Sequence, residues 1–505
     1  MQFDGSYLVS LLTLPALWDA SLLAIGLATL AWLLALVLGF LLASARLCGY
    51  SALSLPAATY TWFFRSVPVL VVILFAYHLP LFSAGPEPFF AGLLALVACE
   101  AAHMAAIQRR GLEAVMDSQQ EAGRALGLSA VGLQRLIVVP QACAACLPRL
   151  LDEYLRVLKL TSLVSVVSLG ELLGTGQSLY LQNARVLETL AAVALYYVII
   201  VSVCKLVFQY LQRKLNFTRR APGILSSETL TSLRAQLQEP GEAPWLHPEA
   251  GAAPALQLQN IHKHFGDHEV LKGIELKVLS GQVVSIIGPP GSGKSSLLRC
   301  INALEGMDQG EIVLYGESFI HAHDNPDNPQ IRRGKRRIGM VFRDARLFAH
   351  LTLLGNLTLA PRYHGIDAVT CEQRAYALLH KVGLLAHARR YPHQLSAGQR
   401  QRVAIARALA LEPDIMLFDE PTAALPPDQV AEVLAIMRDL AGEGMTLLMV
   451  TDEMDFAMGL SDRVVFMEEG QIQLDASPAA IRTEVQGQRV RRFMGMSEVV
   501  VAQAD

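Results

Sequence analysis

The stretch VVSIIGPPGSGKSS, residues 283–296, decides the fold of the second half of this 505-residue chain. A short apolar run, 283–287, has the length and composition of a buried β-strand. A glycine-rich loop follows it, and LLRCINAL, 297–304, then has helical spacing. This strand–loop–helix order, repeated in weaker form up to the C-terminus, predicts an α/β domain.

The same loop carries a phosphate-binding pattern, because GPPGSGKSS fits G-x-x-x-x-G-K-[ST]. Its backbone N–H groups close around phosphate oxygens, and the helix N-terminus adds a favourable dipole. We expect Lys294 to reach the terminal phosphates and Ser295 to face Mg²⁺. The predicted cofactors are therefore ATP and Mg²⁺, and the predicted cofactor residues here are Gly288, Pro289, Pro290, Gly291, Ser292, Gly293, Lys294, Ser295 and Ser296.

A second apolar run, 415–418, ends in two carboxylates, Asp419 and Glu420. Asp419 suits the magnesium shell together with Ser295, and Glu420 suits a general base that activates water.

The first half of the chain differs from this domain in composition, because it is dominated by long apolar runs. The chain is 52% hydrophobic and 17% charged, with a net charge of −3, which gives no case for a nucleic-acid partner. Seven cysteines form no disulfide framework, and we assign the Cys143–Cys146 pair a packing role. Five apolar segments are long enough to cross a bilayer, near 21–45, 57–80, 88–107, 143–169 and 187–210.

Basic residues predict how these segments are oriented. Arg46, the Arg109–Arg110 pair and the basic cluster at 213–220 mark one side. Five crossings then place the N-terminus outside and the second half in the cytoplasm, and the first segment does not read as a cleaved signal peptide. The predicted domains are a transmembrane region at 1–215, a flexible linker at 216–255 with a short helix near 226–238, and a nucleotide-binding domain at 256–505.

Four charged residues stand out within the fourth apolar segment: Asp152, Glu153, Arg156 and Lys159. Ionisable groups at membrane depth often line a pathway. Alternatively they pair with one another, since Asp152 and Glu153 lie four and three residues before Arg156. Glu100 and His103 on the third segment are weaker cases of the same kind.

The loop DSQQEAGRALGLSAVGLQRLIVVPQA, 117–142, resembles the E-A-A loop of binding-protein-dependent importer permeases. The resemblance continues through 147–172 and includes FFRSVPVLVVILF, 63–75, which is similar to polar amino acid permeases. It implies that a short helix here docks on the ATPase and transmits its motion. The coupling residues implied are Glu121, Ala122, Gly123, Leu126 and Gly127, with Gly123 standing where a second alanine is usual.

The stretch LSAGQRQRVAIARALA, 395–410, resembles the signature motif of ABC ATPases, and the whole of 256–495 resembles the ABC ATPases of polar amino acid importers. The resemblance implies that Ser396, Gly398 and Gln399 face the γ-phosphate of an opposing subunit. It also implies that Phe265 stacks on adenine.

Ala397 replaces the usual first glycine of the signature, and three further residues depart from that family pattern. Asp452 stands where a histidine usually contacts the γ-phosphate, Arg343 replaces a usual glutamine, and Pro426 replaces a usual aspartate. We count Arg343 and Asp452 with Glu420 as catalytic candidates. In one reading Arg343 neutralises Asp452 or takes over the γ-phosphate contact, and hydrolysis survives. In the other, the site binds ATP but hydrolyses it poorly. Asp452 pointing away from the site is also open.

The sequence thus predicts an all-α transmembrane permease bundle of about five helices followed by an α/β P-loop ABC ATPase domain. The resemblance implies ATP-driven import of a polar amino acid across the bacterial inner membrane. The expected partners are an extracytoplasmic binding protein, the lipid bilayer and a second copy of the chain or a related one. The alternative is a catalytically weak subunit that acts beside a competent ATPase.

Overall fold

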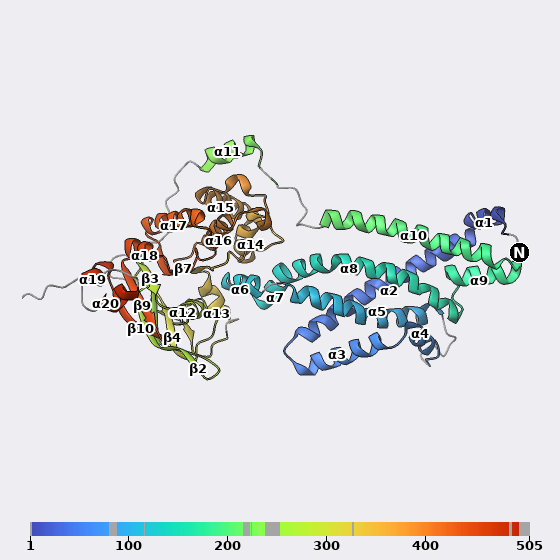
Figure 1. The fold of residues 1–505 in the computed structure, drawn as a ribbon, viewed down its shortest axis with the longest axis horizontal. Helices are drawn as coiled ribbons and strands as arrows, with labels where there is room; N and C mark the ends of the chain where they lie inside the picture. Colours follow the sequence, from blue (N-terminus) through green and yellow to red (C-terminus); the bar gives the residue numbers. More distant parts are fainter. Residues whose placement is uncertain are drawn as a thin grey trace, which may run out of the picture. The chain divides into compact units, whose positions relative to one another are not determined.

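In the computed structural model the chain forms two compact units, which are described separately (Figure 1). The described residues are 3–79, 88–115, 117–215, 223, 225–237, 253–325, 328–483 and 487–493. The first unit contains Met1–Val115 and Val138–Arg219, and the second contains Met116–Ile137 and Arg220–Asp505. The described part of this loop, 117–137, therefore belongs to the same compact unit as the second half of the chain.

The first unit is helical. Its helices are α1 (Gly5–Leu12), α2 (Pro15–Leu47), α3 (Ser51–Ser66), α4 (Val69–Tyr77), α5 (Pro88–Glu113), α8 (Val139–Leu160), the 3₁₀ turn η3 (Thr161–Val167), α9 (Leu172–Asn183) and α10 (Val186–Leu215). By length and composition, four stretches of the described chain could cross a membrane, or five if α3 and α4 count as one bent span. The five predicted segments correspond to these, although α1 and α9 were not foreseen.

The predicted span at 57–80 is not straight, because α3 and α4 meet at an angle of 102°. Pro68 caps α4, and Val67 before it is extended at φ −92° and ψ 132°. A proline excludes its predecessor from the helical region, so the apolar run 63–75 must break here.

Helices α2 and α5 pack through small residues. The buried side of α2 is mostly alanine at helical spacing and includes Ala28, Ala31 and Ala35. A Cβ on Gly39 would lie 2.8 Å from Cβ of Met104 on α5, so the two backbones approach closely there. Small residues at such an interface are typical of helices that associate in a bilayer.

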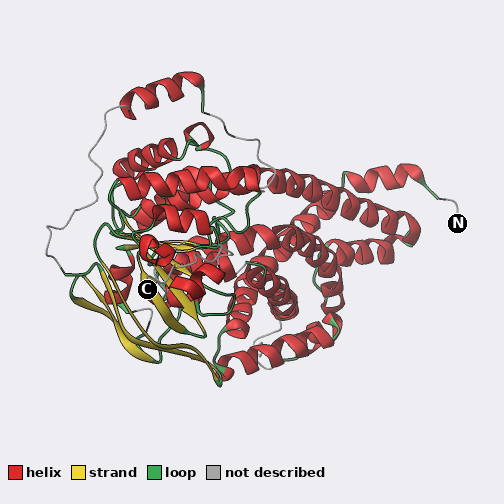
Figure 2. Cartoon of the chain, turned by 60° about the vertical axis from the view of Figure 1, so that its left-hand side comes forward, coloured by secondary structure: helices red, strands yellow, loops and turns green. Residues whose placement is uncertain are grey.

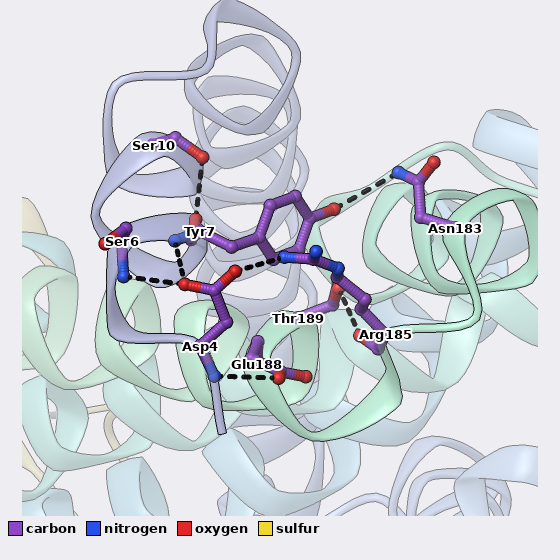
Figure 3. Close-up of polar contacts among 8 residues, drawn as sticks. All are labelled: Asp4, Ser6, Tyr7, Ser10, Asn183, Arg185, Glu188 and Thr189. Carbon is purple, nitrogen blue, oxygen red and sulfur yellow. Dashed lines mark hydrogen bonds and ion pairs between the residues drawn. The ribbon is translucent and has the colours of Figure 1, made fainter. Parts of the chain in front are cut away.

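A polar cluster fixes the N-terminus to the loop between α9 and α10 (Figure 3). Asp4 caps α1 by accepting hydrogen bonds from the backbone N–H groups of Ser6 and Tyr7. Its other oxygen pairs with Arg185 at 2.7 Å, and its own N–H donates to Glu188. The Arg185 guanidinium also lies 4.5 Å from the centre of the Tyr7 ring.

The second unit contains two sheets (Figure 2). The antiparallel one has the order β2 (His268–Val278), β1 (Leu256–Phe265), β4 (Gln309–Leu314), β5 (Glu317–His321). The other has the order β10 (Gln471–Ala476), β9 (Arg463–Glu468), β3 (Val283–Ile287), β8 (Thr446–Val450), β7 (Ile415–Asp419), β6 (Ile338–Val341). Its five strands from β9 to β6 are parallel, and only β10 is antiparallel.

Twelve helices of the described second unit surround these sheets: α6 (Asp117–Ala125), α7 (Ala130–Leu133), α11 (Ser227–Leu237), α12 (Lys294–Ile301), α13 (Pro329–Lys335), α14 (Leu353–Tyr363), α15 (Ala368–Lys381), α16 (Ala397–Leu409), α17 (Pro427–Gly442), α18 (Met454–Leu460), α19 (Pro478–Thr483) and α20 (Gln488–Phe493). Strands β3, β7 and β8 are buried at every residue, as expected for a parallel sheet covered on both faces. The predicted fold class, a helical membrane region followed by an α/β domain, is confirmed.

The predicted linker, 216–255, is only partly described. Helix α11 lies where a short helix was expected near 226–238. Leu225 is buried, and Leu230 and Leu233 pack against the core of the second unit. This part of the linker is therefore held against the α/β domain. The flexible part of the linker is shorter than the range 216–255 expected from the sequence.

Candidate functional site

The C-terminal ends of β3, β8 and β7 bring the predicted site together. In the register of the sheet, Ile286 lies opposite Val450, and Val450 lies opposite Asp419. The next residues along the three strands are the phosphate loop, the Thr451–Asp452 pair and Glu420. Because β8 lies between β3 and β7, Asp452 emerges between the loop and the carboxylates.

The phosphate loop has the backbone that its glycines require. Gly288 and Gly293 have φ of 150° and 96°. A Cβ on Gly288 would lie 2.0 Å from the carbonyl oxygen of Met467, whereas a Cβ on Gly291 would meet open space. The loop is thus closed on its protein side and open at Gly291, which fits a cradle for phosphates.

Lys294 is buried and held inside this loop. Its Nζ donates to the carbonyl oxygens of Gly288 and Pro289 at 2.7 and 2.9 Å. Burial lowers the pKa of Lys294, and the nearby carboxylates Asp452, Glu420 and Asp419 oppose that shift. The two hydrogen bonds to carbonyl oxygens hold Nζ inside the loop, where a phosphate would compete for it.

Ser295 and Asp419 meet as predicted for a magnesium site. The Ser295 hydroxyl donates to Oδ1 of Asp419 at 2.7 Å. A hydroxyl and a carboxylate are hard oxygen ligands, which Mg²⁺ prefers alongside phosphate oxygens. Nearby, Oγ of Ser292 is buried without a hydrogen-bond partner in the described structure, so it too could accept or donate to a bound nucleotide. Ser295 and Asp419 therefore fit Mg²⁺, and the phosphate loop with Lys294 fits the phosphates of ATP.

Arg343 pairs with Glu420 and not with Asp452. Nη1 of Arg343 lies 3.3 Å from Oε2 of Glu420, and no ion pair joins Arg343 to Asp452 within the described part of the chain. Arg343 therefore does not neutralise Asp452 through a direct pair in this conformation, and its contact with a γ-phosphate stays a prediction. The reason is geometric: Glu420 turns out of β7 at φ 45°, while the Asp452 side chain is exposed.

Both Arg343 and Asp452 nevertheless influence the pKa of Glu420. Burial raises its pKa, the charge of Asp452 raises it further, and Arg343 opposes both. A raised pKa suits a general base, provided that it stays below the working pH. Asp452 and Arg343 thus act on Glu420 in opposite directions.

The signature residues begin α16. Ser396 caps this helix in a reciprocal pair of hydrogen bonds with Gln399. Gln429 of α17 accepts hydrogen bonds from the N–H of Gly398 at 2.6 Å and the hydroxyl of Ser396 at 3.2 Å. The donors predicted to face a γ-phosphate are therefore satisfied inside this chain by an amide oxygen, which sequence reasoning missed.

Two further predicted residues lie at the surface. Phe265 ends β1 with 51% of its surface exposed, and Lys263 lies 5.1 Å from its ring centre. A half-exposed aromatic is available for stacking, unlike a core phenylalanine. Pro426 is the N-cap of α17 and offers no side-chain hydrogen bond to that helix, as its chemistry requires.

The coupling segment is bound to the α/β domain through Glu121. Arg299, on the helix that follows the phosphate loop, donates to both Glu121 oxygens at 3.1 and 2.7 Å. Arg346, three residues after Arg343, pairs with the same carboxylate. Burial raises the pKa of Glu121, but the two arginines outweigh it and the net shift is downward.

Two positions of the coupling segment, Gly123 and Gly127, require glycine. A Cβ on Gly123 would lie 2.5 Å from Leu133 and 2.6 Å from Ile137, so an alanine there would have to displace both. Gly127 turns the chain at φ 75° and approaches the carbonyl oxygen of Arg332.

The coupling residues Ala122 and Leu126 are buried. The carbonyl oxygen of Leu126 hydrogen-bonds His364, and the carbonyl oxygen of Leu136 hydrogen-bonds His350. Tyr363 donates to Ser129 at 2.9 Å. Backbone groups of the segment are thus satisfied by side chains from the α/β domain.

Of the four predicted pathway charges, two are paired. Arg156 bonds Glu153 at 2.6 Å and also Glu100 of α5 at 2.7 Å. Asp152 and Lys159 are exposed. The predicted pairing of Glu153 with Arg156 is confirmed. Arg156 also pairs with Glu100, and no ion pair joins it to Asp152 within the described residues.

Three comparisons with known proteins bear on this site. A family model described as "ABC transporter" matches residues 271–423, and one described as "Binding-protein-dependent transport system inner membrane component" matches residues 35–217. Both agree with the predicted resemblance.

Curated relatives match the second half of the chain. It is 46% identical over 248 residues to the octopine permease ATP-binding protein P of Rhizobium radiobacter, covering 48% of this chain and 95% of that protein. It is 46% identical over 240 residues to the glutamine transport ATP-binding protein GlnQ of Bacillus subtilis (47% and 97%). It is 44% identical over 247 residues to the histidine/lysine/arginine/ornithine transport ATP-binding protein HisP of Escherichia coli (47% and 96%).

Among solved structures, the dimeric post-hydrolysis state of the ATP-binding cassette MJ0796 with ADP and Pi is 32% identical, with a TM-score of 0.40, and covers 44% of this chain and 98% of that one.

Proposed function

The chain belongs to the ABC transporter family, with permease and ATPase regions in one polypeptide, and on this premise we propose that it imports a polar amino acid across the bacterial inner membrane. A separate extracytoplasmic protein would deliver the substrate. The names of the relatives, which include glutamine, histidine, lysine, arginine and ornithine, support an amino acid as cargo.

The observation that carries this proposal is the binding of Glu121 by Arg299 and Arg346. Glu121 belongs to a loop between two candidate membrane spans, and Arg299 belongs to the helix that begins at Lys294. A movement of the phosphate loop would reach α6 through one side-chain contact. Such a contact is what an ATP-driven permease needs.

The site residues have distinct proposed roles. Lys294 and the loop amides bind the nucleotide phosphates, and Ser295 with Asp419 holds Mg²⁺, which would shield phosphate charge. Glu420 accepts a proton from the attacking water. Phe265 supports adenine, and Ser396, Gly398 and Gln399 of a second chain complete each site, so that Gln429 must release them on closure.

The proposed arrangement follows the sequence expectations. A permease region at 1–215 has its N-terminus outside, and a linker at 216–255 and an ATPase at 256–505 lie in the cytoplasm. Two chains, identical or related, would supply two composite sites. Charged residues on α8, including Asp152, Glu153, Arg156 and Lys159, are proposed pathway groups.

The charges around Glu420 support a second candidate function. A carboxylate beside a general base raises its pKa, and an arginine paired to it restrains it. A pKa raised above the working pH would leave Glu420 protonated, and the pair with Arg343 would make its carboxylate a weaker base, so either effect would slow hydrolysis. A subunit that binds ATP and hydrolyses it poorly, beside a competent ATPase, is therefore the alternative.

The test is uptake by the full chain in proteoliposomes that enclose Mg·ATP, with an extracytoplasmic extract of the source cells as binding protein. ATP-dependent accumulation of a labelled polar amino acid, lost in Glu420→Gln, is the expected result. ATP binding without hydrolysis in the native chain, with turnover gained by Asp452→His, would instead support the weak subunit. Hydrolysis without uptake of any amino acid would refute the importer.

A further inference from the structure

The side chain of Gln429 lies across the start of the signature helix α16. Its Oε1 accepts hydrogen bonds from the N–H of Gly398 at 2.6 Å and from the hydroxyl of Ser396 at 3.2 Å. Because a backbone N–H can only donate, the amide oxygen of Gln429, and not its NH₂ group, must face Gly398. One oxygen atom therefore receives two donors that are proposed to hold the γ-phosphate of ATP.

This contact depends on the absence of a side chain at Gly398. A Cβ there would lie 2.7 Å from Oε1 and 2.8 Å from Cβ of Gln429, so a larger residue would have to displace the glutamine. The glutamine thus lies in direct contact with the backbone of the signature. An acceptor from an opposing chain can reach these donors only after Gln429 has moved.

The start of α17 explains why the Gln429 side chain bonds a different helix. Gln429 is the third residue of α17, the position from which a glutamine can accept a hydrogen bond from the backbone N–H of the N-cap. The N-cap here is Pro426, which has no N–H to donate. The departure from the family pattern at Pro426 therefore leaves the amide oxygen of Gln429 available to the donors of α16.

The cap is weaker than the ligand with which it would compete. Gln429 offers a neutral acceptor, whereas a phosphate oxygen carries charge, and charge-assisted hydrogen bonds are roughly twice as strong as neutral ones. Two neutral hydrogen bonds correspond to a factor of about five to 150 between capped and open donors. A ligand that binds only the open form loses apparent affinity by that factor. ADP has no γ-phosphate, so its affinity should not depend on the cap.

We propose that Gln429 determines how strongly this chain prefers ATP to ADP, because the γ-phosphate must displace its amide oxygen from Ser396 and Gly398. The inference rests on the proposed composite ATP site and adds a regulatory residue to it. With the cap in place, two chains close only at a higher ATP concentration than the phosphate loop alone would require.

The experiment measures equilibrium binding of Mg·ATP and Mg·ADP to the full chain in lipid nanodiscs that hold two chains. Glu420→Gln is present in every protein compared, so that ATP is not consumed during the measurement. Gln429→Leu removes the acceptor and keeps a side chain of similar size. ATP should then bind about five- to 150-fold more tightly, and the affinity for ADP should change less than about twofold.

A second variant removes the cap without changing Gln429. Pro426→Ser restores a backbone N–H at the N-cap, and Gln429 can accept from it in a capping box. This variant should therefore tighten ATP binding in the same direction as Gln429→Leu. Glu432→Gln is the matched control, because Glu432 joins α17 to Arg402 of α16 through an ion pair and bonds none of the signature donors in the described structure. It should leave both affinities unchanged.

Two results with Gln429→Leu would overturn the proposal: an unchanged affinity for ATP, or parallel changes for ATP and ADP. A parallel change would show that Gln429 only joins α16 to α17, and circular dichroism verifies that each variant is folded. Gln429→Glu places a charged acceptor on the same donors, so it should weaken binding of ATP and not of ADP. Tighter ATP binding by this variant would also contradict the proposal.

The outcome is separable from the import function. If ATP-driven uptake occurs while Gln429→Leu binds both nucleotides as the native chain does, the cap assignment fails alone. If Gln429→Leu gains affinity for ATP but no amino acid is taken up, the import function fails and the cap remains. A chain that binds neither nucleotide would overturn both.

Discussion

Replacing Glu121 by glutamine should release the coupling segment from the α/β domain. Glu121, Arg299 and Arg346 have side-chain exposures of 25%, 21% and 17%, so solvent screens their interaction only in part. Hydrogen bonds to charged groups contribute about 1.5–3 kcal/mol. Since 1.4 kcal/mol is a factor of ten, local opening of α6 should become about ten- to 140-fold more frequent.

Hydrogen exchange of the full chain in nanodiscs measures this opening directly. Backbone amides of 117–126 should exchange faster by that factor in Glu121→Gln, while those of β3 and β7 keep native protection. Glu113→Gln is the control, because its pair with Arg109 is 36–42% exposed and is worth less than about 1 kcal/mol. An increase below threefold in Glu121→Gln would refute the argument that this carboxylate holds the segment.

The same contact has a defined pH dependence. Because the folded-state pKa of Glu121 is lowered, its contribution is fully present above the ordinary glutamate value of about 4.3 and is lost as pH falls below it. After correction for intrinsic exchange, protection of 117–126 should therefore be constant between about pH 7 and 5. A loss of protection within that window would point to a different titrating group.

Three other changes have expected outcomes. Gly288→Ala should abolish equilibrium ATP binding, because its Cβ would clash with a backbone oxygen at 2.0 Å; native affinity would contradict this. Asp452→Asn should lower the pKa of Glu420 and move the acid limb of the pH profile of ATP hydrolysis to lower pH. Arg343→Gln should move this limb to higher pH. Shifts of the same sign would contradict the conclusion that the two residues act on Glu420 in opposite directions. Asp4→Asn should speed exchange of the α1 amides, and unchanged rates would show that its ion pair contributes nothing.

The sequence was informative where chemistry is local. The phosphate loop, the Asp419–Glu420 strand end and the signature cap are defined by neighbouring residues, and the structure places them as their spacing requires. The bend at Pro68 was also readable, since a proline restricts the residue before it. Apolar length alone predicts one span at 57–80, and it carries no information on the bend of 102° that the proline imposes.

Contacts between distant residues could not be predicted in this way. Arg299 is 178 residues from Glu121, and nothing in LLRCINAL distinguishes its arginine from a solvated one. Gln429 accepts a hydrogen bond from the N–H of Gly398 because α17 packs beside the start of α16, and no local sequence pattern predicts that packing. The pairing of Arg156 with Glu100 likewise depends on how two helices are rotated, which apolar periodicity leaves open.

The departures at Arg343 and Asp452 are best understood through Glu420. Relative to the resembled family, a neutral glutamine becomes a cation and a histidine becomes an anion, so the formal charges cancel. The cancellation does not occur in a direct pair, because Arg343 bonds Glu420. It occurs at Glu420, whose pKa one residue raises and the other lowers. Either substitution alone would shift the pKa of the general base Glu420. When both are present, the two shifts oppose each other.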